Sequence, residues 1–254
     1  HCEISTVNRE IGFLKAFFNK AVEWGCLTKS PAAKLKPLKQ AKRRIPRFFT
    51  EREADLLLHK AQRSSSYLYL IIFTALDSGL RKSELIYLSW PDVNFDNLSI
   101  IVQAKGEWHP KDYEIRAIPI NTDLATELKK HKLQQQGITR WVFPTIYGTA
   151  RRNNLGRDFK RLLKNCGLYG PRVGWHTLRH TFASHLVMQG TPLKTVAELL
   201  GHRSTKTTEI YSHLAPDHLR ESTEKLPFGR KKPQNGYSFG DSDKKGARPD
   251  DLTP

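Results

Sequence analysis

Four short segments of the sequence hold side chains that could do chemistry on a phosphate. They are DSGLRKSEL around Arg81, PKDYEIRAIPI beginning at Pro110, HTLRH at 176–180 and LLGHRSTKTTEIYSHL at 199–214. A phosphodiester gains negative charge as a nucleophile attacks it, so the reaction needs cations or hydrogen-bond donors fixed around the nonbridging oxygens. The guanidinium forks of Arg81 and Arg179 suit this task because they bind phosphate oxygens bidentately. Each segment alone is a weak signal.

The order of these segments resembles that of the tyrosine recombinases, the phage integrase family. The motifs follow one another along the chain in this order: an arginine after Gly-Leu, a hairpin lysine, His176-x-x-Arg179, Leu-Gly-His202 and, after eight further residues, Tyr211. The resemblance extends from about residue 5 to residue 226, and STVNREIGFLKAFFNKAVEWGCLTKSPA looks like the end of that family's core-binding domain. The complete set is far more specific than any one motif.

The resemblance implies a role for each of these side chains. Tyr211 would be the nucleophile, Arg81 and Arg179 would hold the scissile phosphate, and His202 would donate a hydrogen bond to it. A free tyrosine has a pKa of about 10 and is mostly protonated at neutral pH, so Tyr211 needs nearby positive charge and a proton acceptor. We expect His176 to accept that proton or to orient the hydroxyl.

A hairpin lysine is the implied acid for the leaving group. The departing deoxyribose 5′-oxygen needs a proton, which the family takes from a lysine between its second and third strands. Lys111 follows Pro110 and lies five residues before Arg116, in a local pattern close to that of the family. Lys105, at the end of the preceding strand, is the alternative, and we favour Lys111. Tyr113 lies in the same turn without histidines nearby and is a much weaker candidate nucleophile than the tyrosine near the C-terminus.

A metal site is the rival interpretation of the two neighbouring histidines. His176 and His180 are four residues apart, which is metal-ligand spacing on a helix. A zinc hydrolase would carry glutamate at the next position, which is Thr177, and no carboxylate cluster supplies a third ligand. We therefore predict no metal and no other cofactor. His180 and His185 are interpreted as structural residues or as supports for the site residues, and His213 is close enough to the tyrosine in sequence to touch the site.

Charge and composition limit the class of partner. The chain has 254 residues, with 42 Lys and Arg against 25 Asp and Glu, a formal net charge of +17 and a pI near 9.9. Such a charge favours a polyanion, with nucleic acid first and an acidic membrane surface second. The longest apolar run, Tyr67–Leu76, is about half of the roughly 20 residues of a membrane span, which excludes an integral membrane protein.

The cysteines and the start of the chain indicate a compartment. Cys2, Cys26 and Cys166 are widely spaced and odd in number, which argues against a disulfide framework and a cysteine-based zinc site. No apolar secretion signal stands at the start. A reducing cytoplasm is therefore the expected compartment. The chain begins His1-Cys-Glu rather than with Met, so we expect an N-terminally truncated fragment.

A basic linker divides the chain. Residues 29–47 contain eight basic side chains, no acidic ones and three prolines, a composition that suits an extended arm along a phosphate backbone. The candidate DNA-binding residues are Lys29, Lys34, Lys36, Lys39, Lys42, Arg43, Arg44 and Arg47. We expect a core-binding-domain remnant and linker over 1–44, a catalytic domain over 45–226 and a disordered tail over 227–254.

The hydrophobic pattern predicts a mainly α fold with a small antiparallel β-sheet, an α+β class. Thr50 and Glu53 form a capping-box pattern at one helix start. Helices are expected over 7–22, 54–61, 67–77, 82–88, 124–135, 155–165, 177–189, 192–200, 205–212 and 216–225. Strands are expected over 99–103 and 115–120, which form a hairpin, and a short third strand over 141–143.

The resemblance implies a site-specific recombinase or integrase. It would cleave and rejoin DNA through a 3′-phosphotyrosyl intermediate, without ATP or metal, and so integrate or excise a mobile element. The implied partners are double-stranded DNA, further copies in a homotetramer on paired sites, and accessory DNA-bending proteins, in the nucleoid of a bacterial cytoplasm. Two alternatives stay open. One is a type IB topoisomerase-like enzyme that relaxes supercoils, and the other is a non-catalytic integrase remnant that only binds DNA.

Overall fold

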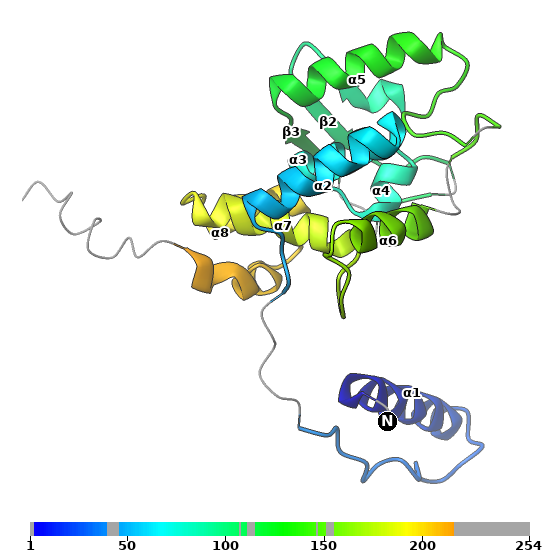
Figure 1. The fold of residues 1–254 in the computed structure, drawn as a ribbon. Helices are drawn as coiled ribbons and strands as arrows, with labels where there is room; N and C mark the ends of the chain where they lie inside the picture. Colours follow the sequence, from blue (N-terminus) through cyan, green and yellow to red (C-terminus); the bar gives the residue numbers. More distant parts are fainter. Residues whose placement is uncertain are drawn as a thin grey trace, which may run out of the picture. The chain divides into compact units, whose positions relative to one another are not determined.

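The computed structural model describes residues 3–39, 46–106, 108–110, 115–145, 147–150 and 155–215. The helices are α1 (Ile4–Glu23), α2 (Glu51–Ser64), α3 (Ser66–Ser78), α4 (Lys82–Ile86), α5 (Thr122–Gln135), α6 (Leu155–Asn165), α7 (Trp175–Met188) and α8 (Leu193–Leu200). Three 3₁₀-helices, η1 (Trp90–Asp92), η2 (Thr205–Thr207) and η3 (Glu209–Leu214), and three strands, β1 (Val93–Asn94), β2 (Ser99–Val102) and β3 (Arg116–Pro119), complete the order (Figure 1). The predicted α+β class, mainly helical with a small antiparallel sheet, is confirmed.

The N-terminal part is one helix with the chain folded back along it. None of the residues of α1 is buried, and Phe13 and Phe17 are each 67% exposed. The returning segment is fixed by Asn8, whose side-chain amide donates to the Leu38 carbonyl at 2.9 Å and accepts from the Leu38 amide at 2.7 Å. The described part of the basic linker that follows α1 has an irregular conformation, as its prolines predict.

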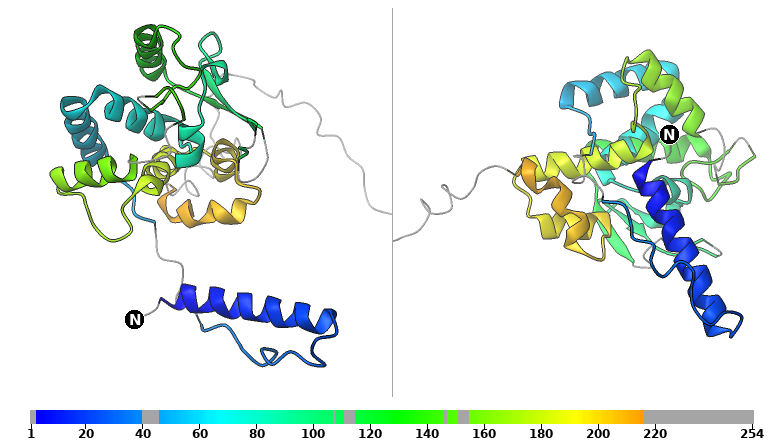
Figure 2. Two further views of the ribbon diagram at one scale, coloured as in Figure 1. Left: turned by 90° about the vertical axis from the view of Figure 1, so that its right-hand side faces the viewer. Right: turned by 90° about the horizontal axis from the view of Figure 1, so that it is seen from below.

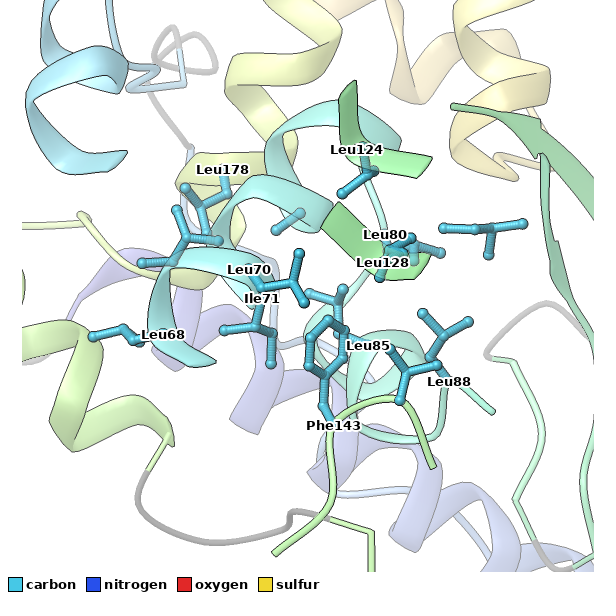
Figure 3. Packing of buried hydrophobic residues seen from close by; sticks show 14 of the residues in the cluster. Leu68, Leu70, Ile71, Leu80, Leu85, Leu88, Leu124, Leu128, Phe143 and Leu178 are labelled. Carbon is cyan, nitrogen blue, oxygen red and sulfur yellow. The ribbon is translucent and has the colours of Figure 1, made fainter. Parts of the chain in front are cut away.

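The core of residues 46–215 is built around α3. This helix is apolar on nearly all sides, and it packs against α2, α5 and α7. Figure 2 shows these helices from two further directions, and Figure 3 shows Leu70 and Ile71 of α3 among the buried side chains. A helix that is apolar on all sides must be enclosed by neighbours. The predicted capping box starts α2, since Thr50 Oγ1 accepts from the Glu53 amide while the Glu53 carboxylate accepts from the Thr50 amide.

The sheet has the order β1-β2-β3 and is antiparallel throughout. Ile100 and Ile118 are direct partners, and both face the core fully buried. The third strand predicted over 141–143 is wrong, because these residues pair with the loop before η1: Trp90 N donates to Arg140 O and Val142 N to Leu88 O. The third strand is instead β1, which sequence analysis left unassigned.

The C-terminal part of the described chain carries α6, α7, α8 and the two 3₁₀-helices. The helix predicted over 205–212 is divided into η2 and η3, with i to i+3 hydrogen bonds such as Tyr211 N to Thr208 O. Thr205, Thr207, Thr208 and Ile210 are β-branched, which weakens an α-helix here. The predicted helix over 216–225, the tail over 227–254 and the expected domain boundary near residue 45 lie outside the described residues.

Candidate active site

Arg81 stands at the start of α4, directly after a sharp turn. The preceding helix α3 ends at Gly79, whose φ of 61° lies in the left-handed region. A Cβ here would lie 2.4 Å from Cδ1 of Phe182, so α7 can pack against this turn only because residue 79 is glycine. The Glu84 carboxylate accepts the Arg81 backbone N–H at 2.7 Å and so caps the first turn of α4.

Glu84 is a buried carboxylate that binds two arginines. It accepts from Arg81 Nη1 at 3.1 Å and from both terminal nitrogens of Arg116, at 3.1 and 2.7 Å. Burial alone would raise the pKa of Glu84, but the hydrogen bonds and charge of Arg116 outweigh it and hold that pKa below its ordinary value. Glu84 is therefore ionised at neutral pH and fixes both guanidinium groups. Glu84 and Arg116 both stand in the motifs quoted from the sequence, but neither was predicted to have a functional role.

Three guanidinium groups converge on the carboxyl end of α8. The last carbonyls of a helix have no partner within it. Here each of three consecutive ones accepts from a different arginine: Leu199 O from Arg116 Nε at 3.0 Å, Leu200 O from Arg179 Nη2 at 2.5 Å, and Gly201 O from Arg81 Nη2 at 3.2 Å. We call Arg81, Arg116 and Arg179 the arginine cluster. It sets three positive charges against the single charge of Glu84.

Arg179 lies deepest in the arginine cluster. It is 6% exposed, and its Nη1 donates to the Gly79 carbonyl at 2.8 Å, which joins α7 to the turn before Arg81. Burial and then the positive charge of Arg81 lower the pKa of Arg179 to about 9, with Glu84 opposing them. Arg179 remains charged at neutral pH, but its environment is short of negative charge. A bound phosphate would supply that charge, which is what a phosphate site requires.

His202 follows the carboxyl end of α8 at once. Gly201 has a φ of 63°, and a Cβ there would lie 2.9 Å from Arg116 Nη1, so glycine is needed both for the turn and for the close approach of Arg116. The His202 Nδ1 lies 2.9 Å from Thr208 Oγ1, and Thr208 is fully buried. This contact fixes the imidazole plane of His202, directly after the helix end that binds the arginine cluster.

Tyr211 lies inside the domain on η3. It is 2% exposed and packs with Ala183, Val187, Val196 and Leu200 in a second apolar cluster. Its hydroxyl lies 2.5 Å from Nδ1 of His180. We expected His176 to accept the proton of this hydroxyl or to orient it, and His180 to be structural or to support the site residues. His176 is exposed, on the same face of α7 one turn earlier, with its ring 6.2 Å from that of His180.

Both partners of this contact are neutral. Burial raises the pKa of Tyr211 to about 12, although the charge of Arg179 opposes the shift. Burial, and then the positive potentials of His176 and Arg179, lower the pKa of His180 to about 4. In the tautomer of the neutral imidazole that carries its proton on Nε2, Nδ1 accepts a hydrogen bond from the phenol O–H. The structure therefore holds the candidate nucleophile protonated and covered.

The two candidate lysines differ in what the structure says of them. Lys111, like Tyr113, lies outside the described residues. The Lys105 ammonium is nearly buried, bound to the Asp92 carboxylate and donating to the Tyr87 carbonyl at 2.5 Å. Burial lowers the pKa of Lys105 despite the opposing hydrogen bond that its ammonium donates to Asp92. Lys105 is thus held at the base of the hairpin.

The basic linker is only partly described. Lys29, Lys34, Lys36 and Lys39 are exposed, whereas Lys42, Arg43 and Arg44 lie outside the described residues. Arg47 is exposed and pairs with Glu53 at 2.5 Å. Four ammonium groups of this linker therefore face solvent, where a phosphate backbone could reach them.

Metal ligation finds no support among the residues that the structure covers. These contain no group of three or more His, Cys, Asp or Glu side chains placed to hold an ion. His185, which was interpreted as structural, lies with its Nε2 2.9 Å from the Phe49 carbonyl. The arrangement as a whole places a cluster of cationic side chains close to a buried tyrosine.

Comparison with known families identifies the family of this chain. The family described as the phage integrase family matches residues 47–218, which include the whole arginine cluster and Tyr211. The chain belongs to the phage integrase family. The candidate site residues that the structure describes thus lie within the matched region.

Several curated relatives of this integrase-family chain are tyrosine recombinases. It is 30% identical to the tyrosine recombinase XerC-like protein of Caldanaerobacter subterraneus subsp. tengcongensis, over 87% of this chain and 65% of that protein. It is 32% identical to tyrosine recombinase XerA of Pyrococcus horikoshii, over 87% of this chain and 74% of that protein. The chain therefore spans about two thirds to three quarters of the length of these relatives.

Solved structures share the fold. The integrase of transposon Tn1549, in complex with a circular intermediate DNA, superposes with a TM-score of 0.72 at 24% identity, over 87% of this chain and 79% of that one. The catalytic domain of bacteriophage HP1 integrase gives a TM-score of 0.57 at 26% identity, over 74% of this chain and 99% of that one. In the part of the chain that the structure covers, none of the helices has the length and apolar character needed to cross a membrane.

Proposed function

We propose that this protein is a site-specific DNA recombinase that integrates or excises a mobile element through a 3′-phosphotyrosyl intermediate. The observation that carries the proposal is the arginine cluster, three guanidinium groups against one carboxylate, beside His202 and Tyr211 in a chain of the phage integrase family. An excess of fixed positive charge in a partly buried site stabilises the pentacoordinate phosphate more than it stabilises the starting diester.

The proposed cleavage forms one bond to phosphorus and breaks one. The Tyr211 oxygen attacks the scissile phosphate and loses its proton to a base, for which His176 is our candidate. The bond from phosphorus to the 5′-oxygen breaks, and a hairpin lysine, Lys111 or alternatively Lys105, gives that oxygen a proton. Arg81 and Arg179 hold the nonbridging oxygens and His202 donates to one of them. Attack by the 5′-hydroxyl of a partner strand reverses these steps and joins the strands.

Binding to double-stranded DNA would use the basic linker as well as the site. The proposed contacts are made by Lys29, Lys34, Lys36, Lys39, Lys42, Arg43, Arg44 and Arg47. Each phosphate contact releases counterions, so the logarithm of affinity should fall with the logarithm of salt by roughly 0.9 per contact. An affinity for DNA that does not change with salt concentration would contradict the proposed role of the basic linker.

The proposed working unit is a homotetramer on two DNA sites, aided by accessory DNA-bending proteins, in the bacterial nucleoid. Residues 216–225, which lie outside the described residues, would dock on a neighbouring copy. A protein truncated after Ser212 that still assembles and recombines normally would count against this docking. The assembled mass on paired sites can be measured by light scattering.

The two alternatives are less well supported than recombination. The named relatives are tyrosine recombinases rather than topoisomerases, and every residue type that the resemblance requires is present. Relaxation of a supercoiled plasmid without any recombinant product would favour the topoisomerase-like alternative. Binding without any covalent step would favour the remnant.

Covalent capture tests the proposal directly. The substrate is a duplex from the ends of the mobile element, nicked beside the cleavage position so that the released strand is lost, with EDTA present. The wild-type protein should give a denaturant-resistant adduct, and Tyr211→Phe should give none while binding equally well. Arg81→Ala and Arg179→Ala should each slow capture by about 10²–10³, as expected for one lost transition-state donor. Undiminished capture by Tyr211→Phe would remove the nucleophile assignment.

A further inference from the structure

The side chain of Tyr211 is almost completely covered by protein. An attacking oxygen must come into line with a phosphorus atom on a strand that approaches from solvent. Tyr211 is 2% exposed, and the apolar side chains of Ala183, Val187, Val196 and Leu200 surround it. Cleavage therefore requires that this side chain first be uncovered or moved.

One polar contact holds the hydroxyl in place. The structure gives Tyr211 a single side-chain hydrogen bond among the described contacts, at 2.5 Å to Nδ1 of His180. The ring of His180 also lies 5.9 Å from the ring of Tyr211, at 54°. A buried hydroxyl that loses its only acceptor is left unsatisfied, which strongly disfavours the buried position.

One face of α7 indicates the direction in which the Tyr211 hydroxyl would leave the apolar cluster. His176 and His180 are four residues apart on this helix, so their rings lie on one face, one turn apart. His180 is half-buried, and His176 is exposed. Movement of the Tyr211 hydroxyl from His180 toward His176 would bring it out of the apolar cluster and toward solvent.

We propose that His180 is a positioning residue that holds Tyr211 in its covered, protonated resting position, and that strand cleavage begins when this hydrogen bond breaks. The inference rests on the proposed role of Tyr211 as the nucleophile. The low basicity of the buried imidazole agrees with holding rather than with proton removal, since a phenol does not transfer its proton to so weak a base. His180 thus sets how often the nucleophile becomes available.

The test measures exposure of Tyr211 without DNA. The full chain is labelled with 3-fluorotyrosine, which gives one ¹⁹F signal for each of its eight tyrosines, and the Tyr211 signal is assigned by its loss in Tyr211→Phe. The shift between H₂O and D₂O reports exposure of each ring. In the wild type the Tyr211 signal should show no solvent shift.

Two variants separate the hydrogen bond from the bulk of the side chain. His180→Leu fills the space without an acceptor, and the Tyr211 signal should acquire the solvent shift of an exposed ring. His180→Asn places an amide oxygen near the position of Nδ1 and should restore the shielded signal. On the nicked substrate, His180→Leu should form the adduct about tenfold faster than wild type, and His180→Asn at nearly the wild-type rate. If His180→Leu does not fold, the unbranched His180→Met serves in its place.

A Tyr211 signal that stays shielded in the folded apolar variant would overturn the proposal. Slower capture by that variant would overturn it too, and would mean that His180 takes the proton instead. Failure of the proposed function looks different, because the wild-type protein would then form no adduct while the ¹⁹F result still reports on His180.

Discussion

Replacing Glu84 by alanine should destabilise the protein severely and disable the proposed phosphate site at once. The Glu84 side chain is buried and accepts four hydrogen bonds of 2.7–3.1 Å from Arg81 and Arg116. Removing one partner of a buried ion pair costs about 3–5 kcal/mol, because the other charge stays buried without compensation. Here the arginine cluster would be left with three positive charges and no carboxylate.

The loss can be measured by urea unfolding. With a slope of about 2.5 kcal/mol per molar, the expected cost lowers the midpoint by about 1–2 M. Glu84→Gln keeps the shape and one acceptor, so it should lie between alanine and wild type. The matched control is Glu127→Gln, which removes an exposed i,i+3 pair with Lys130 and should cost less than about 0.5 kcal/mol.

Activity provides the second measurement on the same variants. Capture by folded Glu84→Gln should be slower by at least about 10²-fold, because Arg81 loses the group that aims it. An unfolding midpoint of Glu84→Ala equal to that of the Glu127 control would refute the reasoning. It would mean that the guanidinium groups are held by backbone carbonyls alone.

Three further predictions follow from the geometry. Gly79→Ala should cost about 2–4 kcal/mol from its positive φ and its clash with Phe182, whereas Gly137→Ala, with nothing near its Cβ, should cost only about 1 kcal/mol in the same urea assay. Because the folded pKa of His180 is about 4, against 6.5 ordinarily, protons favour the unfolded chain below pH 6.5, and stability should fall by up to about 3 kcal/mol between pH 6.5 and 4; a pH series in which His180→Asn falls equally would contradict this. A substrate with a sulfur leaving atom needs no acid, so it should rescue Lys111→Ala but not Lys105→Ala; rescue of the second alone would move the role to Lys105.

Local rules predicted most of the fold. The Thr-x-x-Glu pattern at residue 50 marks a helix start because its two reciprocal hydrogen bonds depend only on neighbouring residues. The apolar run in α3 predicts a buried helix, because a helix that is apolar on all sides must be enclosed by its neighbours. The strand predicted over 141–143 failed because those residues pair with a loop some fifty residues earlier, and short segments carry no signal of such a partner.

The candidate site was also predicted only in part. Motif order suggested Arg81, His176, Arg179, His202 and Tyr211 as a set. The fold brings Arg81, Arg179 and His202 to the carboxyl end of α8, and it packs Tyr211 of η3 against α7. The partner of the Tyr211 hydroxyl was not predicted. It depends on how η3 packs against α7, which spacing along one helix does not encode.

The carboxyl end of α8 has a consequence for mutagenesis. Its acceptors for the arginine cluster are backbone carbonyls, which every residue type possesses. Exchanging the side chains of Leu199 or Leu200 would change apolar packing but leave the same oxygens in place. An alanine scan would therefore report nothing about these contacts, and aligned sequences could differ at both positions while keeping the guanidinium groups where they are. Only a change that moves the last turn itself, such as an inserted residue or an ester in place of an amide, would expose what this helix end contributes.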